Sequence, residues 1–257
     1  MTDKIIIHLS DLHIGDCMEN AHNTWRVFDA IAQNYAGCPV LITGDIVDSG
    51  DEGQMIKTRD LIDTLAESNP VVVVPGNHDY AWHGIHCNDN AAAAWHRHLP
   101  PAMWMNYSSS KYRQICDGLF AAEHDGLVIF GIDSGDPTDK VHTARGYISE
   151  GLTEELRREL TARKGKTRIV MLHHHPFDHG TFTRLVGAER FTRAVESNCE
   201  ILLFGHEHRF GIWRNRNGIP LTVASHKTTS NAIGGHLLIS VIQVTGDGNF
   251  WHRLEVV

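Results

Sequence analysis

The stretch Val71-Val72-Val73-Val74-Pro75-Gly76-Asn77-His78-Asp79 joins an apolar run to a polar cluster. Four consecutive valines predict a β-strand without a solvated face, because a half-exposed strand would alternate apolar and polar side chains. Such strands belong to sheets that are covered on both faces. The polar residues 76–79 follow the strand at its carboxyl end, which lines the ligand crevice of open α/β sheets. The stretch therefore predicts an α/β fold with a candidate site after this strand.

Four further predicted strands also end in polar residues. The clusters are Asp11-x-His13 after 5–9, Gly44-Asp45-x-x-Asp48 after 40–43, His173-His174-His175-Pro176 after 168–172 and Gly205-His206-Glu207-His208 after 201–204. Five loops from five strands could converge on one place. Asp, Asn and His are ligands of divalent transition metals, and no cysteine is among them. About eight donors exceed the four that a structural zinc site takes. They suffice for two ions about 3.5–4 Å apart, which can polarise a phosphate and deprotonate a water between them.

The rest of the chain alternates short β-branched runs with amphipathic helices. Helices are predicted at 23–35, 54–66, 153–164 (with Thr153 as the N-cap) and 188–197, strands at 119–122 and 127–132, and an all-β tail at 210–214, 221–224, 237–244 and 250–256.

Residues 80–111 interrupt this alternation. They hold three of the six tryptophans and a single predicted helix at 91–99. The aromatic side chains could cap the site, with Trp82 and His83 contacting substrate. They could equally pack on the core, as aromatic residues more often do. We expect one domain, 1–257, with an irregular insertion here.

Composition narrows the class of protein. The 257 residues carry a formal charge of −8, with 42% hydrophobic and 21% charged residues, which is typical of a soluble globular chain. No apolar run reaches the roughly 18–20 residues of a membrane span. The five cysteines are scattered, and the N-terminus lacks a signal-peptide pattern, so we expect a cytoplasmic protein without a membrane partner. The acidic balance disfavours nucleic acid as a partner without excluding it. The oligomeric state is left open.

The ordered set D-x-H, G-D-x-x-D, G-N-H-D, H-x-P and G-H-x-H, from about residue 5 to 210, resembles the calcineurin-like metallophosphoesterase superfamily. The S-D-L-H opening at 10–13, the T-G-D-I-V-D segment at 43–48 and Gly146-x-Ile148 are most similar to class III cyclic nucleotide phosphodiesterases and glycerophosphodiesterases. This resemblance implies a four-layer α/β/β/α sandwich of two mixed sheets flanked by helices.

The resemblance also implies the ligands of two metals. Asp11, His13, Asp45 and His208 would hold one ion, and Asp45, Asn77, His174 and His206 the other, with Asp45 as the bridge. His174 is selected because the family's ligand lies two residues before the proline. His173 and His175 would then be packing or supporting groups. The resemblance implies divalent ions such as Mn²⁺, Fe²⁺, Zn²⁺ or Co²⁺, with Fe³⁺ as a further form of iron, and the sequence leaves their identity open.

The chemistry implied is hydrolysis of a phosphoester by a metal-bridging hydroxide. His78 would act on the transition state or the leaving oxygen, oriented by Asp48, and imidazole suits this task because it exchanges protons near neutral pH. Asn77 and His78 would contact the substrate. We expect a phosphodiesterase acting on cyclic nucleotides or other small phosphodiesters. A phosphomonoesterase, a nucleotide pyrophosphatase or a nuclease on the same scaffold is the alternative, and a non-catalytic interaction module is the remote one.

Overall fold

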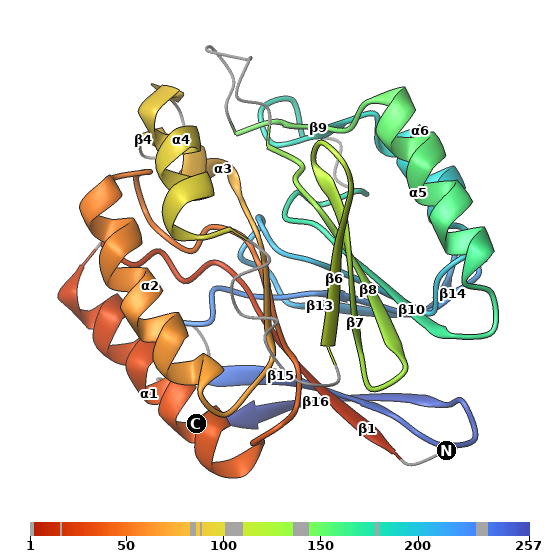
Figure 1. Ribbon diagram of the computed structural model, residues 1–257, viewed down its shortest axis with the longest axis horizontal. Helices are drawn as coiled ribbons and strands as arrows, with labels where there is room; N and C mark the ends of the chain where they lie inside the picture. Colours follow the sequence, from red (N-terminus) through yellow and green to blue (C-terminus); the bar gives the residue numbers. More distant parts are fainter. Residues whose placement is uncertain are drawn as a thin grey trace.

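The structure, a computed structural model, describes residues 3–15, 17–82, 86–87, 89–100, 110–135, 144–177, 180–229 and 236–257. Its two large sheets lie between two layers of helices (Figure 1). The first sheet has the order β16-β15-β1-β2-β3, and the second has the order β13-β14-β12-β10-β8-β7-β6. Both sheets are mixed, so the α/β/β/α sandwich predicted from the sequence is confirmed.

The first sheet and the helices on its outer face come mostly from the first hundred residues. The strands are β1 (Lys4–Leu9), β2 (Val40–Thr43), β3 (Val71–Val74), β15 (Leu238–Val244) and β16 (Phe250–Val256), and the helices are α1 (Met18–Asn34), α2 (Glu52–Ala66), α3 (Asn77–Tyr80) and α4 (Asp89–His98). Strands β1, β2 and β3 run parallel, so their carboxyl ends lie at one edge. The first three polar clusters therefore start from the same edge of this sheet.

The second sheet comes from residues 110–224. Its strands are β6 (Ser110–Cys116), β7 (Leu119–His124), β8 (Leu127–Ile132), β10 (Thr167–Met171), β12 (Ile201–Phe204), β13 (Gly211–Arg216) and β14 (Ile219–Ala224), and its helices are α5 (Glu150–Ala162) and α6 (Ala188–Val195). Two short pairs complete the chain: β4 (Ala81–Trp82) with β5 (His86–Cys87), and β9 (Gly146–Tyr147) with β11 (Leu185–Val186). Strands β8, β10, β12 and β14 run parallel.

Three apolar clusters hold the four layers together. One packs α1, α2 and α4 on the first sheet, a second packs α5 and α6 on the second sheet, and the third fills the space between the sheets. Trp95 of α4 is 1% exposed and belongs to the first cluster, so this side chain packs on the core. The other candidate substrate contacts of the insertion, the side chain of Trp82 and all of His83, lie outside the described residues.

Three differences from the sequence prediction have a clear physical cause. Helix α1 begins at Met18, five residues earlier than expected, because Asn20 and Asn23 fill its buried face and hide the apolar periodicity. Ser149 caps α5: its Oγ accepts a hydrogen bond from the Leu152 N–H (3.1 Å), so Thr153 lies inside the helix and is not the N-cap. Strand β6 was not predicted, because its sequence SKYRQIC is largely polar. Among the described helices, none combines the length and the apolar character of a membrane span.

Candidate metal centre

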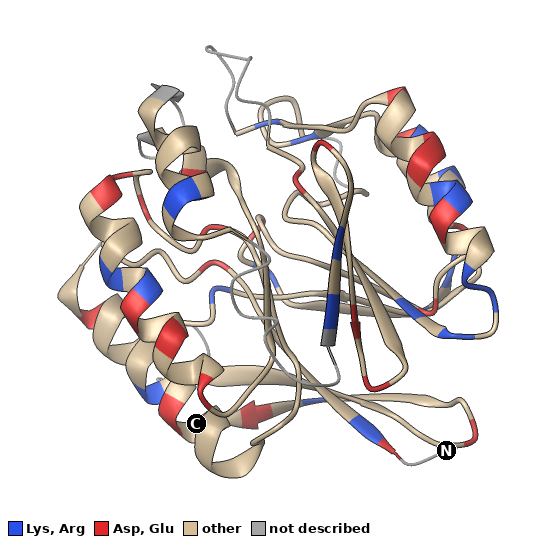
Figure 2. Cartoon of the chain, viewed as in Figure 1, with Lys and Arg blue, Asp and Glu red and all other residues tan. Residues whose placement is uncertain are grey.

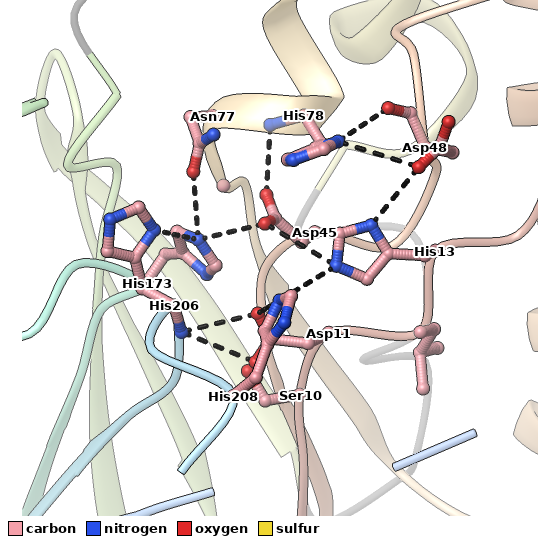
Figure 3. Close-up of polar contacts among 12 residues, drawn as sticks. Ser10, Asp11, His13, Asp45, Asp48, Asn77, His78, His173, His206 and His208 are labelled. Atoms are coloured by element: carbon pink, nitrogen blue, oxygen red, sulfur yellow. Dashed lines mark hydrogen bonds and ion pairs between the residues drawn. The ribbon is translucent and has the colours of Figure 1, made fainter. Parts of the chain in front are cut away.

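The five polar clusters converge in space (Figure 3). Asp11, His13, Asp45 and His208 place one ligand atom each within 4.8 Å of the others, and Asp45, His173 and His206 do the same. Asp45 belongs to both groups. The loops after β1, β2, β10 and β12 supply these side chains, and α3, directly after β3, adds Asn77 and His78. The carboxyl ends of strands from both sheets thus meet at one polar site.

The first group brings two imidazoles to two carboxylates. Nε2 of His13 lies 3.1 Å from Nε2 of His208, which lies 3.3 Å from Oδ1 of Asp11. Oδ2 of Asp45 lies 3.8 Å from Nε2 of His13. Burial raises the pKa of Asp11, but the hydrogen bond with His208 and the charges of His173 and His208 together outweigh this effect and lower the pKa. An ionised carboxylate facing imidazole nitrogens is a donor set that suits a divalent metal.

The second group is centred on His173. Its Nε2 lies 3.2 Å from Oδ1 of Asn77, 3.2 Å from Oδ2 of Asp45 and 3.1 Å from Nδ1 of His206. Its Nδ1 lies 2.8 Å from the carbonyl oxygen of Thr43, which can only accept, so Nδ1 carries a proton. In the neutral ring, Nε2 then carries a lone pair, which faces two other acceptors, Oδ1 of Asn77 and Oδ2 of Asp45. A cation at this place would accept the lone pairs of all these atoms. A backbone carbonyl that fixes the tautomer of the ring is typical of metal-binding histidines.

Without a metal, a proton can serve as that cation. Burial lowers the pKa of His173, but the charge and hydrogen bond of Asp45, the charge of Asp11 and the hydrogen bond to Thr43 together outweigh this effect and raise the pKa to about 9. In turn, burial raises the pKa of Asp45, while His173 and His78 hold it well below its usual range. The carboxylate therefore stays ionised, and a bound metal would replace the proton on Nε2 of His173.

The structure places His173, rather than the predicted ligand His174, next to Asp45. Nε2 of His173 lies 3.2 Å from Oδ2 of Asp45, whereas Nδ1 of His174 lies 2.9 Å from Oγ of Ser134. Nε2 of His174 is buried without a hydrogen-bond partner among the described residues, and its ring lies 4.6 Å from the ring of His206. Burial lowers the pKa of His174 well below its usual value. The assignment of His174 stays a prediction, and the structure adds His173 as a second candidate ligand.

His175 faces away from the polar site. Its ring packs at 4.5 Å from Phe204 and at 6.1 Å from Phe177 and Trp213. The structure thus places His175 among aromatic rings and His173 at the polar site, next to Asp45.

His78 and Asp48 are also close together, in a different arrangement from the one expected. Nδ1 of His78 lies 2.6 Å from the backbone carbonyl oxygen of Asp48 and 3.7 Å from its carboxylate. The carboxylate lies closer to Nδ1 of His13, at 3.4 Å. The backbone of Asp48 therefore orients His78, while its side chain orients the metal ligand His13. The His78 side chain is 21% exposed, so a substrate can reach it.

Asp79 is a supporting residue whose role the sequence left open. Its Oδ1 accepts hydrogen bonds from the N–H groups of Ile46 (3.0 Å) and Val47 (2.9 Å), and its Oδ2 accepts one from Gly76 (2.8 Å). These bonds join the loop after β2 to the loop after β3. In addition, the N–H of His78 donates to Oδ1 of Asp45 (2.9 Å), which leaves Oδ2 of Asp45 facing the histidines.

The backbone at the site is strained. Five of the candidate ligands have positive φ, in the left-handed region that residues other than glycine rarely adopt. They are Asp11 (54°), His13 (45°), Asp45 (49°), His206 (77°) and His208 (53°). Strain of this kind costs roughly 1–3 kcal/mol per residue and clusters at functional sites. It supports the assignment of these side chains by an observation that is independent of their distances.

Two sheets packed face to face, with metal-ligand side chains gathered at their strand ends, define an α/β sandwich with a candidate metal centre. The sequence matches the calcineurin-like phosphoesterase family over residues 5–210, and the chain belongs to this family. The resemblance in the five motifs is thereby confirmed. No curated protein matches the sequence.

Solved structures share the fold at low sequence identity. GAP50, the anchor in the inner membrane complex of Plasmodium, aligns with a TM-score of 0.59 at 12% identity, covering 100% of this chain and 85% of GAP50. The calcineurin-like phosphoesterase YfkN from Bacillus subtilis gives 0.54 at 11%, covering 99% and 90%. A Staphylococcus aureus protein described as a 5′-nucleotidase gives 0.55 at 13%, covering 100% of this chain and 54% of that one. At these identities the likeness establishes the fold alone.

Proposed function

We propose that the protein is a dinuclear metal-dependent phosphodiesterase for cyclic nucleotides or other small phosphodiesters. The observation that carries the proposal is the shared carboxylate of Asp45, whose Oδ2 lies 3.8 Å from Nε2 of His13 and 3.2 Å from Nε2 of His173. A carboxylate oxygen with ligand groups on both sides is suited to bridge two cations, because it is anionic and offers two lone pairs. Asn77 and His206 complete the second group.

The residues fit a pair of divalent ions. Nε2 of His206 is buried without a hydrogen-bond partner among the described residues, and its Nδ1 faces His173. Oxygen and nitrogen donors of this kind accept Mn²⁺, iron, Zn²⁺ or Co²⁺. Two such ions would polarise a phosphate and lower the pKa of a water held between them.

The protein's own part is to hold the ligands and to act on the leaving group. Asp48 and Thr43 fix the ring orientations of His13 and His173 from behind. The Nδ1–H of His78 donates to the Asp48 carbonyl, so its Nε2 is free to carry and deliver a proton. A diester requires such a proton because its leaving alkoxide is a strong base, so Nε2 of His78 is the proposed donor.

A substrate panel tests the proposal. Purified protein with added Mn²⁺ is offered bis-p-nitrophenyl phosphate, p-nitrophenyl phosphate, cyclic AMP, a glycerophosphodiester and single-stranded DNA. We expect the small diesters to be hydrolysed with the highest kcat/KM, and a chelator to abolish the reaction. A preference for p-nitrophenyl phosphate would favour a phosphomonoesterase, and cleavage of DNA alone would favour a nuclease. Full metal occupancy without turnover on any ester would point to an interaction module.

A further inference from the structure

A small parallel sheet, β9 with β11, lies outside the two large sheets (Figure 1). Its register pairs Leu185 with Gly146 and Val186 with Tyr147. Leu185 and Gly146 are buried, whereas Val186 is 37% and Tyr147 is 42% exposed. Side chains alternate between the two faces of a strand, and residues paired across neighbouring strands share a face. One face of this small sheet is therefore buried, and the other, the open face, meets the solvent.

The buried face packs against the candidate metal centre. A Cβ added at Gly146 would lie 2.4 Å from Cγ of His174, so the strand touches this ring. The N–H of Tyr147 donates to the carbonyl oxygen of Ser134 (3.0 Å), and Oγ of Ser134 lies 2.9 Å from Nδ1 of His174. The backbone of β9 thus stands between the metal centre and the open face, which is a separate surface.

Two arginines extend the open face at the amino ends of both strands. The N–H of Gly146 donates to the carbonyl oxygen of Arg184 (3.3 Å), and continuing the register by one residue places Arg184 beside Arg145. By alternation, both arginines belong to the same face as Tyr147 and Val186. Figure 2 shows basic positions beside β9, at the top of the view. Like charges opposite each other on neighbouring strands are destabilising.

No carboxylate balances these two positive charges among the described residues. The Nε–H of Arg145 donates to the backbone carbonyl oxygen of Thr181 (2.9 Å), and Arg184 makes no ion pair there. Glu189, in the first turn of α6, pairs with Arg193 instead (3.6 Å). A guanidinium offers five N–H donors in a planar fork that matches the oxygens of a phosphate. A phosphate held between the two arginines would remove their repulsion.

An exposed aromatic ring lies next to the arginines on the open face. Tyr147 follows Arg145 by two residues of the strand, so about 7 Å separate their Cα atoms. Val186 lies beside Tyr147, and Phe182, 68% exposed, follows the Thr181 carbonyl that Arg145 contacts. Exposed apolar side chains gathered among charged ones mark interaction sites. A phosphate site beside an aromatic ring suits a nucleotide, because its base can stack on the ring.

We propose that the open face of β9 and β11 is a second binding site, which takes a nucleoside monophosphate. The phosphate lies between Arg145 and Arg184, and the base stacks on the ring of Tyr147. This site goes beyond the proposed hydrolysis, because β9 separates it from the metal centre and its occupant is bound without being cleaved.

Titration calorimetry of the whole chain with AMP, in the presence of a chelator, measures this site apart from any hydrolysis. Adenosine and inorganic phosphate are the partial probes. We expect AMP to bind about tenfold more tightly than either of them, because it makes both contacts. Arg145→Gln and Arg184→Gln should each weaken AMP binding about tenfold. Tyr147→Leu should weaken the binding of AMP several-fold and leave the binding of inorganic phosphate unchanged.

Arg59→Gln is the matched control. Arg59 lies on α2, which packs on the first sheet, and pairs with Asp63 (3.5 Å). The variant makes the same change in net charge away from the open face, so it should keep the wild-type affinity for AMP. Thermal unfolding of each variant separates lost binding from lost folding. No binding at millimolar AMP, or wild-type affinity in both Arg145→Gln and Arg184→Gln, overturns the inference and leaves the proposed hydrolysis untouched.

Discussion

Replacing Gly205 with alanine should damage the metal centre although no ligand is changed. A Cβ added at Gly205 would lie 1.9 Å from Oγ of Ser10 and 2.4 Å from Oδ2 of Asp11. Ordinary van der Waals contact begins at 3.4 Å, so Asp11 has to move by about 1 Å. Ser10 has little room to yield, because it is buried and its hydroxyl donates to the carbonyl of Thr43 (3.0 Å).

A displacement of this size is expected to lower both the rate and the stability. Misplacement of a reacting group by about 1 Å can cost about 100-fold in rate, and overpacking a buried site costs about 1–3 kcal/mol of stability. For a chain of this length, that corresponds to a decrease in Tm of roughly 2–12 °C. We therefore expect kcat/KM for bis-p-nitrophenyl phosphate to fall about 100-fold, with weaker metal binding.

Hydrolysis of bis-p-nitrophenyl phosphate at saturating Mn²⁺, together with thermal unfolding, measures both effects. Gly151→Ala is the matched control: Gly151 lies exposed in α5, and an added Cβ meets no atom within 4 Å. This control should keep full activity and gain a little stability, since alanine favours helices. Activity of Gly205→Ala within twofold of the wild type would refute the assignment of Asp11 as a constrained ligand.

Three other predictions concern the ligands and His78. Asp45→Asn should abolish hydrolysis and lower metal content at both sites, and near-normal activity would contradict the bridging role. His78→Ala should reduce kcat by about 100-fold with metal content intact, in the range of general acid catalysis, whereas a large loss of metal would identify His78 as a ligand. His173→Ala should lose metal from the second group, and His174→Ala should lose much less; metal analysis of the two variants side by side distinguishes them, and the reverse order would identify His174 as the ligand, as the sequence predicts.

The sequence carries enough information to predict the sandwich and most of the site. Apolar strands that end in polar clusters predict an α/β fold with a site at its strand ends, because β3 and β12 are buried and their next residues emerge at one edge. Such a pattern depends only on the types of the residues and their order, and both can be taken directly from the sequence. Asp11, Asp45 and His208 were found in this way, and the structure brings them together. The four-layer arrangement followed from the resemblance to the family.

The remaining features depend on contacts between distant segments. His173 faces Asp45 across two segments that lie far apart in the sequence, and the local sequence contains no record of this contact. The start of α1 was missed for a similar reason: the side chains of Asn20 and Asn23 are buried because they donate to backbone carbonyls of other loops. Prediction of a helix from the spacing of apolar residues assumes that polar residues are exposed, so it fails where polar residues lie on the buried face.

Metal stoichiometry tests the central claim most directly. The chain is purified without metal, saturated with Mn²⁺ and freed of excess ion, and the metal is then counted per chain by elemental analysis. We predict two ions per wild-type chain. The Asp45→Asn variant, compared when it is folded to the same extent as the wild type, should bind fewer. Fewer than one ion bound per wild-type chain at saturating Mn²⁺ would contradict the dinuclear centre.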